Sequence, residues 1–331
     1  MNAPRALPYV VGQWVSGARF YGRERLLAEL LASSGDWHWL AGLRRVGKTS
    51  LLKQLEQLSL AEGEGRLPLF WDLQGVESRE DLALGLGDAL LDGEEALERL
   101  GISVDLAETE DPLRSLARLA GKTASRGAML LLLLDEADDL AALGRREPGL
   151  AKELWATLIG TPRTRVVMAS SIRLAAGERG WLGGDGKRAF GGPRLLGVLE
   201  EGEARCLLLQ DQLPPDVRPE IPDAELESLL SACGRHPMLL QMAGRRYLEA
   251  GNAEEALRQM ESDRAVHHLL AVDFELMSPE ERRALEILAR GGLSDGGVTG
   301  RLEELGVLQL AGGNLEVSCR FLSSWLLSKT S

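Results

Sequence analysis

Short, continuous apolar runs alternate with longer segments of helical periodicity over the first 200 residues. Strands that are covered on both faces, as in a parallel sheet, read as such runs. We therefore predict strands at residues 36–41, 67–73, 128–134 and 165–173. Leucine and alanine recur every three or four positions in the predicted helices, which open at residues 22–24 and span residues 49–60 and 149–159. Strands that alternate with helices predict an α/β fold.

Residues 177–192 interrupt this pattern with closely spaced glycines. Such a composition predicts a mobile loop. Trp181 and Phe190 are its aromatic residues, and two interpretations of them are open. They could belong to a binding loop, or they could fold back and pin the loop onto the domain; we favour the second.

The rest of the chain has mainly helical periodicity, with helices predicted at residues 200–212, 223–233, 237–249 and 253–270. Ser278 then begins a cap with proline and acids in the first turn. A second helix at 297–305 and a hairpin at 307–317 complete the pattern of a winged helix. We expect three parts: an N-terminal arm and α/β core, a helical lid, and a winged-helix domain, at residues 1–198, 199–272 and 273–331.

Residues 42–49 lie between the first strand and its helix and have the spacing G-x-x-x-x-G-K-T. In this context the pattern predicts a phosphate-binding loop, in which glycines let backbone N–H groups face a phosphate at a helix N-terminus. Lys48 would reach the β- and γ-phosphates, and the Thr49 hydroxyl would bind Mg²⁺. Ser50 lies one residue too late for the metal. The predicted nucleotide-binding residues of this segment are Gly42, Arg45, Val46, Gly47, Lys48, Thr49 and Ser50.

The apolar run at 128–134 ends in Asp135 and Glu136. A buried strand that ends in two acids is typical of the Walker B element of P-loop ATPases. Asp135 would hold Mg²⁺, and Glu136 would polarise the attacking water, which favours hydrolysis over binding alone. Asp72 ends the preceding strand, and we expect it to cap a turn rather than to enter the site.

Polar residues also end the strand at 165–173. Because ligand contacts gather at the carboxyl ends of parallel strands, Ser170 or Ser171 could sense the γ-phosphate and Arg173 could neutralise it. Arg163, before the strand, could instead act in trans across a subunit interface. Either arginine could also be a surface residue.

The arm before the first strand is well placed to cover a nucleotide base. Tyr9, Val10 and Val11 are candidates for adenine contact, and Arg23 for a phosphate or interdomain contact; packing of the arm is the equal alternative. His236, next to Pro237 at the start of a predicted helix, could approach phosphates or simply cap the helix.

These motifs together resemble the STAND NTPases of the AAA+ class. The resemblance rests on Y-G-R-E at residues 21–24, the phosphate loop, L-L-L-D-E at 132–136 and G-R-H-P at 234–237. It implies ATP rather than GTP, base contact by residues 8–11, and a nucleotide-sensing turn at His236 and Pro237. Ser170, Ser171 and Arg173 would occupy the sensor position. It further implies a switch whose nucleotide state sets the angles between core, lid and winged helix.

STAND proteins usually carry sensor repeats or an effector domain, and the chain ends after the winged helix. We therefore expect a protein partner or effector in trans, in a bacterial conflict or signalling system, and a nucleotide-dependent homo-oligomer. The alternative is a DNA-associated AAA+ ATPase that resembles origin-recognition or transposition regulators.

Charge bears on that alternative. The net charge of −12 and the acids beside Arg301 in the predicted recognition helix disfavour DNA binding, because phosphate contact needs cations. Residues 128–134 are too few to span a bilayer, and the N-terminus has no apolar signal core. We expect a cytoplasmic protein without membrane contact.

Overall fold

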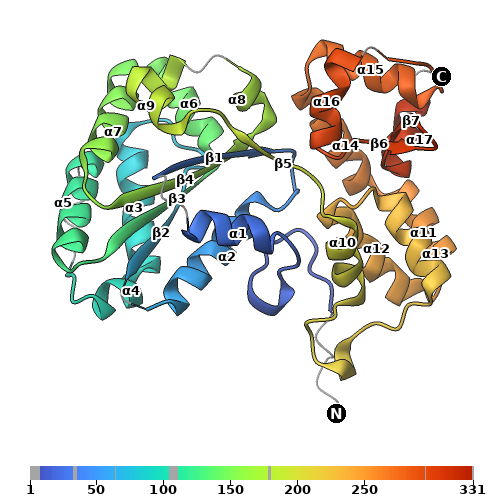
Figure 1. Ribbon diagram of the computed structural model, residues 1–331, viewed down its shortest axis with the longest axis horizontal. Helices are drawn as coiled ribbons and strands as arrows, with labels where there is room; N and C mark the ends of the chain where they lie inside the picture. Colours follow the sequence, from blue (N-terminus) through green and yellow to red (C-terminus); the bar gives the residue numbers. More distant parts are fainter. Residues whose placement is uncertain are drawn as a thin grey trace. The chain divides into compact units, whose positions relative to one another are not determined.

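The computed structural model describes residues 8–32, 36–63, 65–103, 111–177, 180–294 and 296–329. They divide into two compact units, whose elements are labelled in Figure 1. The sheet unit comprises residues 25–41 and 48–194. The helical unit comprises the arm to residue 24, the loop 42–47 and the chain from residue 195 onwards.

One sheet has the strand order β2-β3-β4-β1-β5. Its strands are β1 (Trp37–Gly42), β2 (Arg66–Asp72), β3 (Met129–Asp135), β4 (Thr164–Ser171) and β5 (Arg194–Leu196). β2, β3 and β4 are parallel, and Asp72 is paired with Asp135 at the carboxyl ends of β2 and β3. The predicted α/β fold with a parallel sheet is confirmed. The strand predicted at 165–173 ends earlier, at Ser171, because helix α8 begins with the next residue.

Helices cover both faces of this sheet, with α1 and α2 on one side and α3, α5 and α7 on the other (Figure 1). The helices up to α9 are α1 (Glu24–Ala32), α2 (Lys48–Ala61), α3 (Arg79–Asp92), α4 (Glu94–Arg99), α5 (Pro112–Ser125), α6 (Ala137–Arg146), α7 (Pro148–Gly160), α8 (Ile172–Ala176) and α9 (Gly183–Phe190). In the part of the chain that the structure describes, no helix is both long and apolar enough to cross a membrane.

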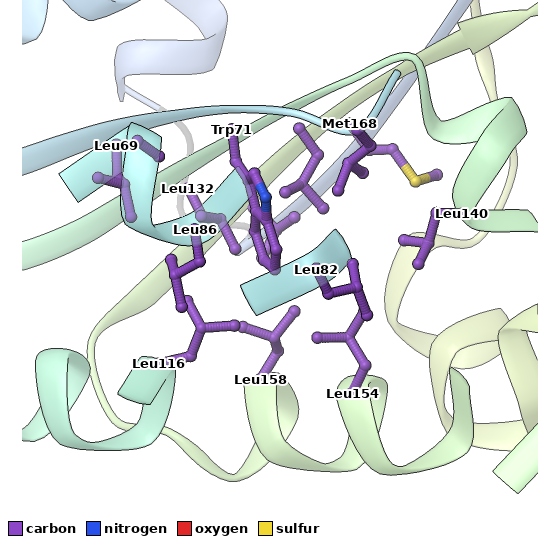
Figure 2. Close-up of a cluster of buried hydrophobic side chains, with 14 of the residues drawn as sticks. Leu69, Trp71, Leu82, Leu86, Leu116, Leu132, Leu140, Leu154, Leu158 and Met168 are labelled. Atoms are coloured by element: carbon purple, nitrogen blue, oxygen red, sulfur yellow. The ribbon is translucent and has the colours of Figure 1, made fainter. Parts of the chain in front are cut away.

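The core of the sheet unit lies between the sheet and helices α3, α5 and α7. Figure 2 shows Trp71 of β2 among leucines of these helices, including Leu82, Leu116 and Leu158. Alternate residues of β3, such as Leu130 and Leu132, face the same cluster. The residues between them are also buried, which explains why the strand reads as a continuous apolar run.

The loop predicted at 177–192 is wrong in part, because its second half forms helix α9. Trp181 and Phe190 are buried, as the second interpretation of these aromatics predicts. Trp181 makes edge-to-face contacts with Trp39 and Trp155, and Phe190 contacts Trp155 and Trp37 in the same way. Burial of these rings outweighs the low helix propensity of glycine here.

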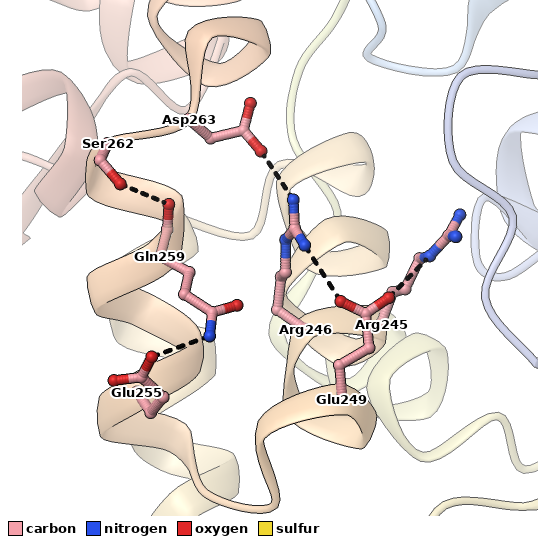
Figure 3. A network of polar contacts seen from close by, with 7 residues as sticks. All are labelled: Arg245, Arg246, Glu249, Glu255, Gln259, Ser262 and Asp263. Carbon is pink, nitrogen blue, oxygen red and sulfur yellow. Dashed lines mark hydrogen bonds and ion pairs between the residues drawn. The ribbon is translucent and has the colours of Figure 1, made fainter.

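Five helices precede the winged helix in the helical unit: α10 (Glu201–Leu209), α11 (Asp223–Cys233), α12 (Pro237–Ala250), α13 (Ala253–Glu261) and α14 (Arg264–Leu276). The single helix predicted at 253–270 is wrong, because Asp263 caps a new helix through the amide of Ala265 at 2.8 Å. Arg246 of α12 donates to Asp263 and to Glu249 in the polar network of Figure 3. The boundary expected at 272/273 falls within α14.

The last segment has the elements predicted for a winged helix: α15 (Pro279–Ala289), α16 (Gly296–Glu304), β6 (Leu308–Ala311), β7 (Asn314–Val317) and α17 (Arg320–Ser328). Ser278 and Glu281 form the predicted capping box at the start of α15. β6 and β7 pair antiparallel around Gly312 and Gly313, which both have positive φ.

Candidate nucleotide-binding site

The predicted phosphate-binding loop runs from the end of β1 at Gly42 to Lys48, the first residue of α2. A Cβ at Gly42 would lie 2.8 Å from the carbonyl oxygen of Leu196 and 2.9 Å from Val46 Cγ1, so only glycine fits there. Gly47 has φ +99°, which turns the chain into the helix. Both glycines of the G-x-x-x-x-G-K-T pattern thus stand where the backbone requires glycine.

Lys48, Thr49 and Asp135 come together at the carboxyl edge of the sheet. Asp135 is buried, and burial raises its pKa above the ordinary value. Hydrogen bonds from the Thr49 hydroxyl and from the Glu136 amide, at 3.1 Å, and the charge of Lys48 partly offset this rise. A carboxylate and a hydroxyl side by side next to a lysine are the donor set that Mg²⁺ with a nucleotide phosphate requires.

Glu136 is exposed and has a left-handed backbone conformation, with φ +50°. A side chain in this region costs about 1–3 kcal/mol and is found mostly at functional sites. Asp72, across from Asp135, is exposed and accepts a hydrogen bond from the amide of Gln74 at 2.9 Å. Asp72 therefore caps the turn after β2, as expected.

The end of β4 is held from two directions. Ser170 is fully buried; its hydroxyl accepts from Trp39 Nε1 at 2.8 Å and donates to the carbonyl of Ser171. Asp138 accepts from the amide and the hydroxyl of Ser171. Arg173 is exposed in the first turn of α8, after the carboxyl end of β4. Arg163 instead precedes the amino-terminal end of β4.

In the helical unit, the arm is anchored by Tyr9. Its ring is buried against Gly244, and its hydroxyl donates to the carbonyl of Leu208. The amide of Val10 donates to Gln241 Oε1 at 3.0 Å, and the side chains of Val10 and Val11 remain half-buried. Tyr9 thus packs the arm, as one of the two interpretations predicts.

Arg23 lies against the loop at residues 42–47. Its guanidinium donates to the carbonyls of Val46 at 3.2 Å and Gly197 at 2.6 Å, and its amide donates to Glu203 at 2.6 Å. Burial lowers the pKa of Arg23 to about 10, so the side chain stays charged at neutral pH. In this structure Arg23 therefore holds the backbone of the loop.

His236 also contacts this loop. It precedes Pro237, the first residue of α12, and its Nε2 lies 3.2 Å from the carbonyl oxygen of Arg44. The amide of Arg44 donates to Asp273 Oδ1 of α14 at 2.8 Å. The backbone of Arg44 is therefore held at its N–H by Asp273 and at its carbonyl by His236, and both of these side chains are buried.

Asp273 was missed by sequence reasoning. The available signal was an acid among apolar residues of a predicted helix, between Val272 and Phe274. A buried carboxylate needs a donor, but the sequence does not say which one.

No family model matches the chain, and no curated protein matches it. Among solved structures, 93% of the chain aligns with 96% of the Walker-type ATPase PABY2304 of Pyrococcus abyssi, with a TM-score of 0.67 and 18% identity. The ORC2 protein of Aeropyrum pernix, in ADPNP–ADP complexes, aligns over 92% of its length with 95% of the chain, at a TM-score of 0.45 and 16% identity. At 18% identity the similarity to PABY2304 shows the fold alone, which is an α/β unit with a parallel sheet followed by a C-terminal helical part.

Proposed function

We propose that the protein is an ATP-binding and ATP-hydrolysing switch. The observation that carries this proposal is the double anchorage of Arg44, whose amide donates to Asp273 of α14 and whose carbonyl lies against His236 at the start of α12. Arg44 belongs to the loop that would close around the phosphates. A change in the loop would therefore alter the contacts of both helices, and a ligand shifts a conformational equilibrium only through such differential contacts.

The side chains at the carboxyl edge of the sheet suit Mg²⁺ with ATP or ADP. Lys48 would neutralise charge on the phosphates, and Thr49 and Asp135 would hold the metal, since their oxygens already lie within hydrogen-bond reach of each other. Glu136, which is exposed beside them, would orient the attacking water and accept its proton. Bound ATP would supply the phosphoanhydride bond that is broken.

The remaining candidates have supporting roles in this proposal. Val10 and Val11 keep partly exposed side chains for contact with the base. Arg173, at the carboxyl end of β4, would neutralise charge in cis, and Arg163 would do so only from a neighbouring copy. Ser170 would act through Ser171, because its hydroxyl is buried.

The resemblance to STAND NTPases supports the finer part of the proposal. In such a switch the core, lid and winged helix would change their relative angles with the nucleotide, and a protein partner or effector would act in trans. A nucleotide-dependent homo-oligomer is part of the same proposal. Light scattering with ADP, with a slowly hydrolysed ATP analogue and with neither would show whether the mass of the protein depends on the nucleotide.

Hydrogen–deuterium exchange tests the switch itself. Backbone amides at residues 237–250 and 264–276 would be compared between protein saturated with ADP and protein saturated with the ATP analogue. We expect different protection in the two states, and no difference in Lys48→Ala, which cannot bind the phosphates. Equal protection in both states, with binding of both nucleotides verified by calorimetry, would refute the coupling.

A further inference from the structure

The first turn of α6 carries two aspartates that contact the strands on either side of β3. Asp138 Oδ2 accepts from the amide of Ser171, at the end of β4, at 2.7 Å, and its Oδ1 accepts from the Ser171 hydroxyl. Asp139 Oδ2 accepts from the amide of Gly75, in the turn after β2, at 2.7 Å. Since β2, β3 and β4 are neighbours in the sheet, this single turn, which follows β3, contacts the end of β4 and the turn after β2.

These contacts are not ordinary helix capping. Acids in a first turn usually serve the amides and the dipole of their own helix. Both oxygens of Asp138 instead bond a residue of another element, more than thirty positions along the chain. The turn begins directly after Glu136, whose left-handed backbone directs the chain into α6. The two aspartates are therefore connected directly, through the first turn of α6, to Asp135 and Glu136.

Ser171 is held on its other side as well. Its neighbour Ser170 is buried and accepts from the indole of Trp39 at 2.8 Å. The chain after Ser171 leads into α8, where Arg173 is exposed. The bond to Asp138 thus fixes where the residues after β4 lie relative to Asp135 and Glu136.

We propose that Asp138 is a positioning residue for ATP hydrolysis, which holds the end of β4 in register with Asp135 and Glu136. This inference rests on the proposed hydrolytic function. A shift of about 1 Å in groups around a reacting centre can lower a rate by about 10²-fold without equal loss of binding. The expected signature is therefore a loss in kcat that the affinity for the ATP analogue does not share.

Three variants test this role. Asp138→Ala removes both bonds, whereas Asp138→Asn can still accept from the Ser171 amide and donate to its hydroxyl. Asp111→Ala is the matched control, because Asp111 caps α5 through the amides of Leu113 and Arg114 and so loses comparable bonds elsewhere. Each protein would be measured for single-turnover hydrolysis, affinity for the ATP analogue and thermal unfolding.

We expect Asp138→Ala to hydrolyse ATP on the order of 10–10² times more slowly, with analogue affinity within about threefold of wild type. Asp138→Asn should recover most of the rate, and Asp111→Ala should keep both values. Should Asp138→Ala not fold, Ser171→Ala should show a smaller loss of the same kind. This variant removes the hydroxyl bond to Asp138 and the cap bond from the Leu174 amide at 3.4 Å, but keeps the bond from the Ser171 amide to Asp138.

Wild-type rates in Asp138→Ala, or in Ser171→Ala when that variant is used instead, would overturn the positioning role alone. Equal losses of rate and affinity without recovery in Asp138→Asn would do the same. A wild-type protein that binds ATP but never hydrolyses it would overturn the proposed hydrolysis, and the role of Asp138 with it.

Discussion

Removal of the Asp273 carboxylate should weaken nucleotide binding. In Asp273→Ala the amide of Arg44 loses the acceptor that lies 2.8 Å away in a buried setting. A hydrogen bond to a charged group contributes about 1.5–3 kcal/mol. At 1.4 kcal/mol per factor of ten, its loss limits the rise in Kd to about 10- to 100-fold. This limit applies if the nucleotide binds only to the conformation in which the loop is anchored. Kd then rises in proportion as the fraction of molecules in that conformation falls.

For Asp273→Asn we expect a smaller rise in Kd than for Asp273→Ala. The asparagine oxygen can still accept from Arg44, but without the charge the bond is roughly half as strong. Half the free energy corresponds to the square root of the factor, so Kd should rise by about 3- to 10-fold. A graded series of wild type, Asn and Ala is the expected result.

The assay is calorimetric titration with ADP and Mg²⁺ at fixed ionic strength, with urea unfolding of each variant in parallel. Asp263→Ala is the control, because Asp263 caps the same helix through the amide of Ala265, and its ion pair among the described residues is with Arg246 of α12 rather than with the loop. It should lose about 0.5–2 kcal/mol of stability and keep its Kd. Wild-type affinity in Asp273→Ala, or an equal loss in Asp263→Ala, would refute the reasoning.

Other predictions concern the sheet unit. Lys48→Ala should lose nucleotide binding, which filter binding measures. Glu136→Gln should bind ATP but not hydrolyse it, which phosphate release measures. Normal turnover in Glu136→Gln would exclude Glu136 as the water-orienting residue. Because burial raises the pKa of Asp135, Mg²⁺ affinity should fall on acidification at a higher pH than an ordinary aspartate allows. Without metal, this carboxyl group binds more protons in the folded protein than in the unfolded chain. The free energy of unfolding should therefore fall as the pH rises through the raised pKa. Urea unfolding at several pH values measures this slope, and the contribution of Asp135 to it should be absent in Asp135→Asn. Trp39→Phe leaves the buried Ser170 hydroxyl without its donor and should cost about 1 kcal/mol in urea unfolding.

The strands of the sheet were predictable because a strand that is buried on both faces has a continuous run of apolar residues in the sequence. β2 and β3 differ from the predicted spans by one residue at each end, and α11 matches its predicted span. Errors arose where tertiary packing outweighs local preference. Helix α9 forms in a glycine-rich segment because Trp181 and Phe190 are buried against aromatic neighbours, and Asp263 divides a predicted helix by capping a new one.

Some residues of the candidate site were likewise predictable from the sequence, and others were not. Residues with fixed spacing in a motif, such as Lys48 and Thr49, could be assigned a place from the sequence. Asp138 and Asp273 could not, because each acts on the backbone of a distant segment. Such a bond requires only an acceptor and an amide at the right place in the fold, and neither leaves a pattern in the sequence.

The winged helix bears on the choice between a switch and a DNA-associated ATPase. Its hairpin, β6 and β7, contains no lysine or arginine, and Arg301 is the one cation of α16. Arg301 lies 3.5 Å from the buried carboxylate of Glu281, at the start of α15. Contact with a DNA phosphate would have to compete with that ion pair and leave Glu281 buried without it, which is costly. The hairpin and second helix therefore offer a phosphate backbone little attraction, and for this reason we propose the switch rather than the DNA-associated alternative.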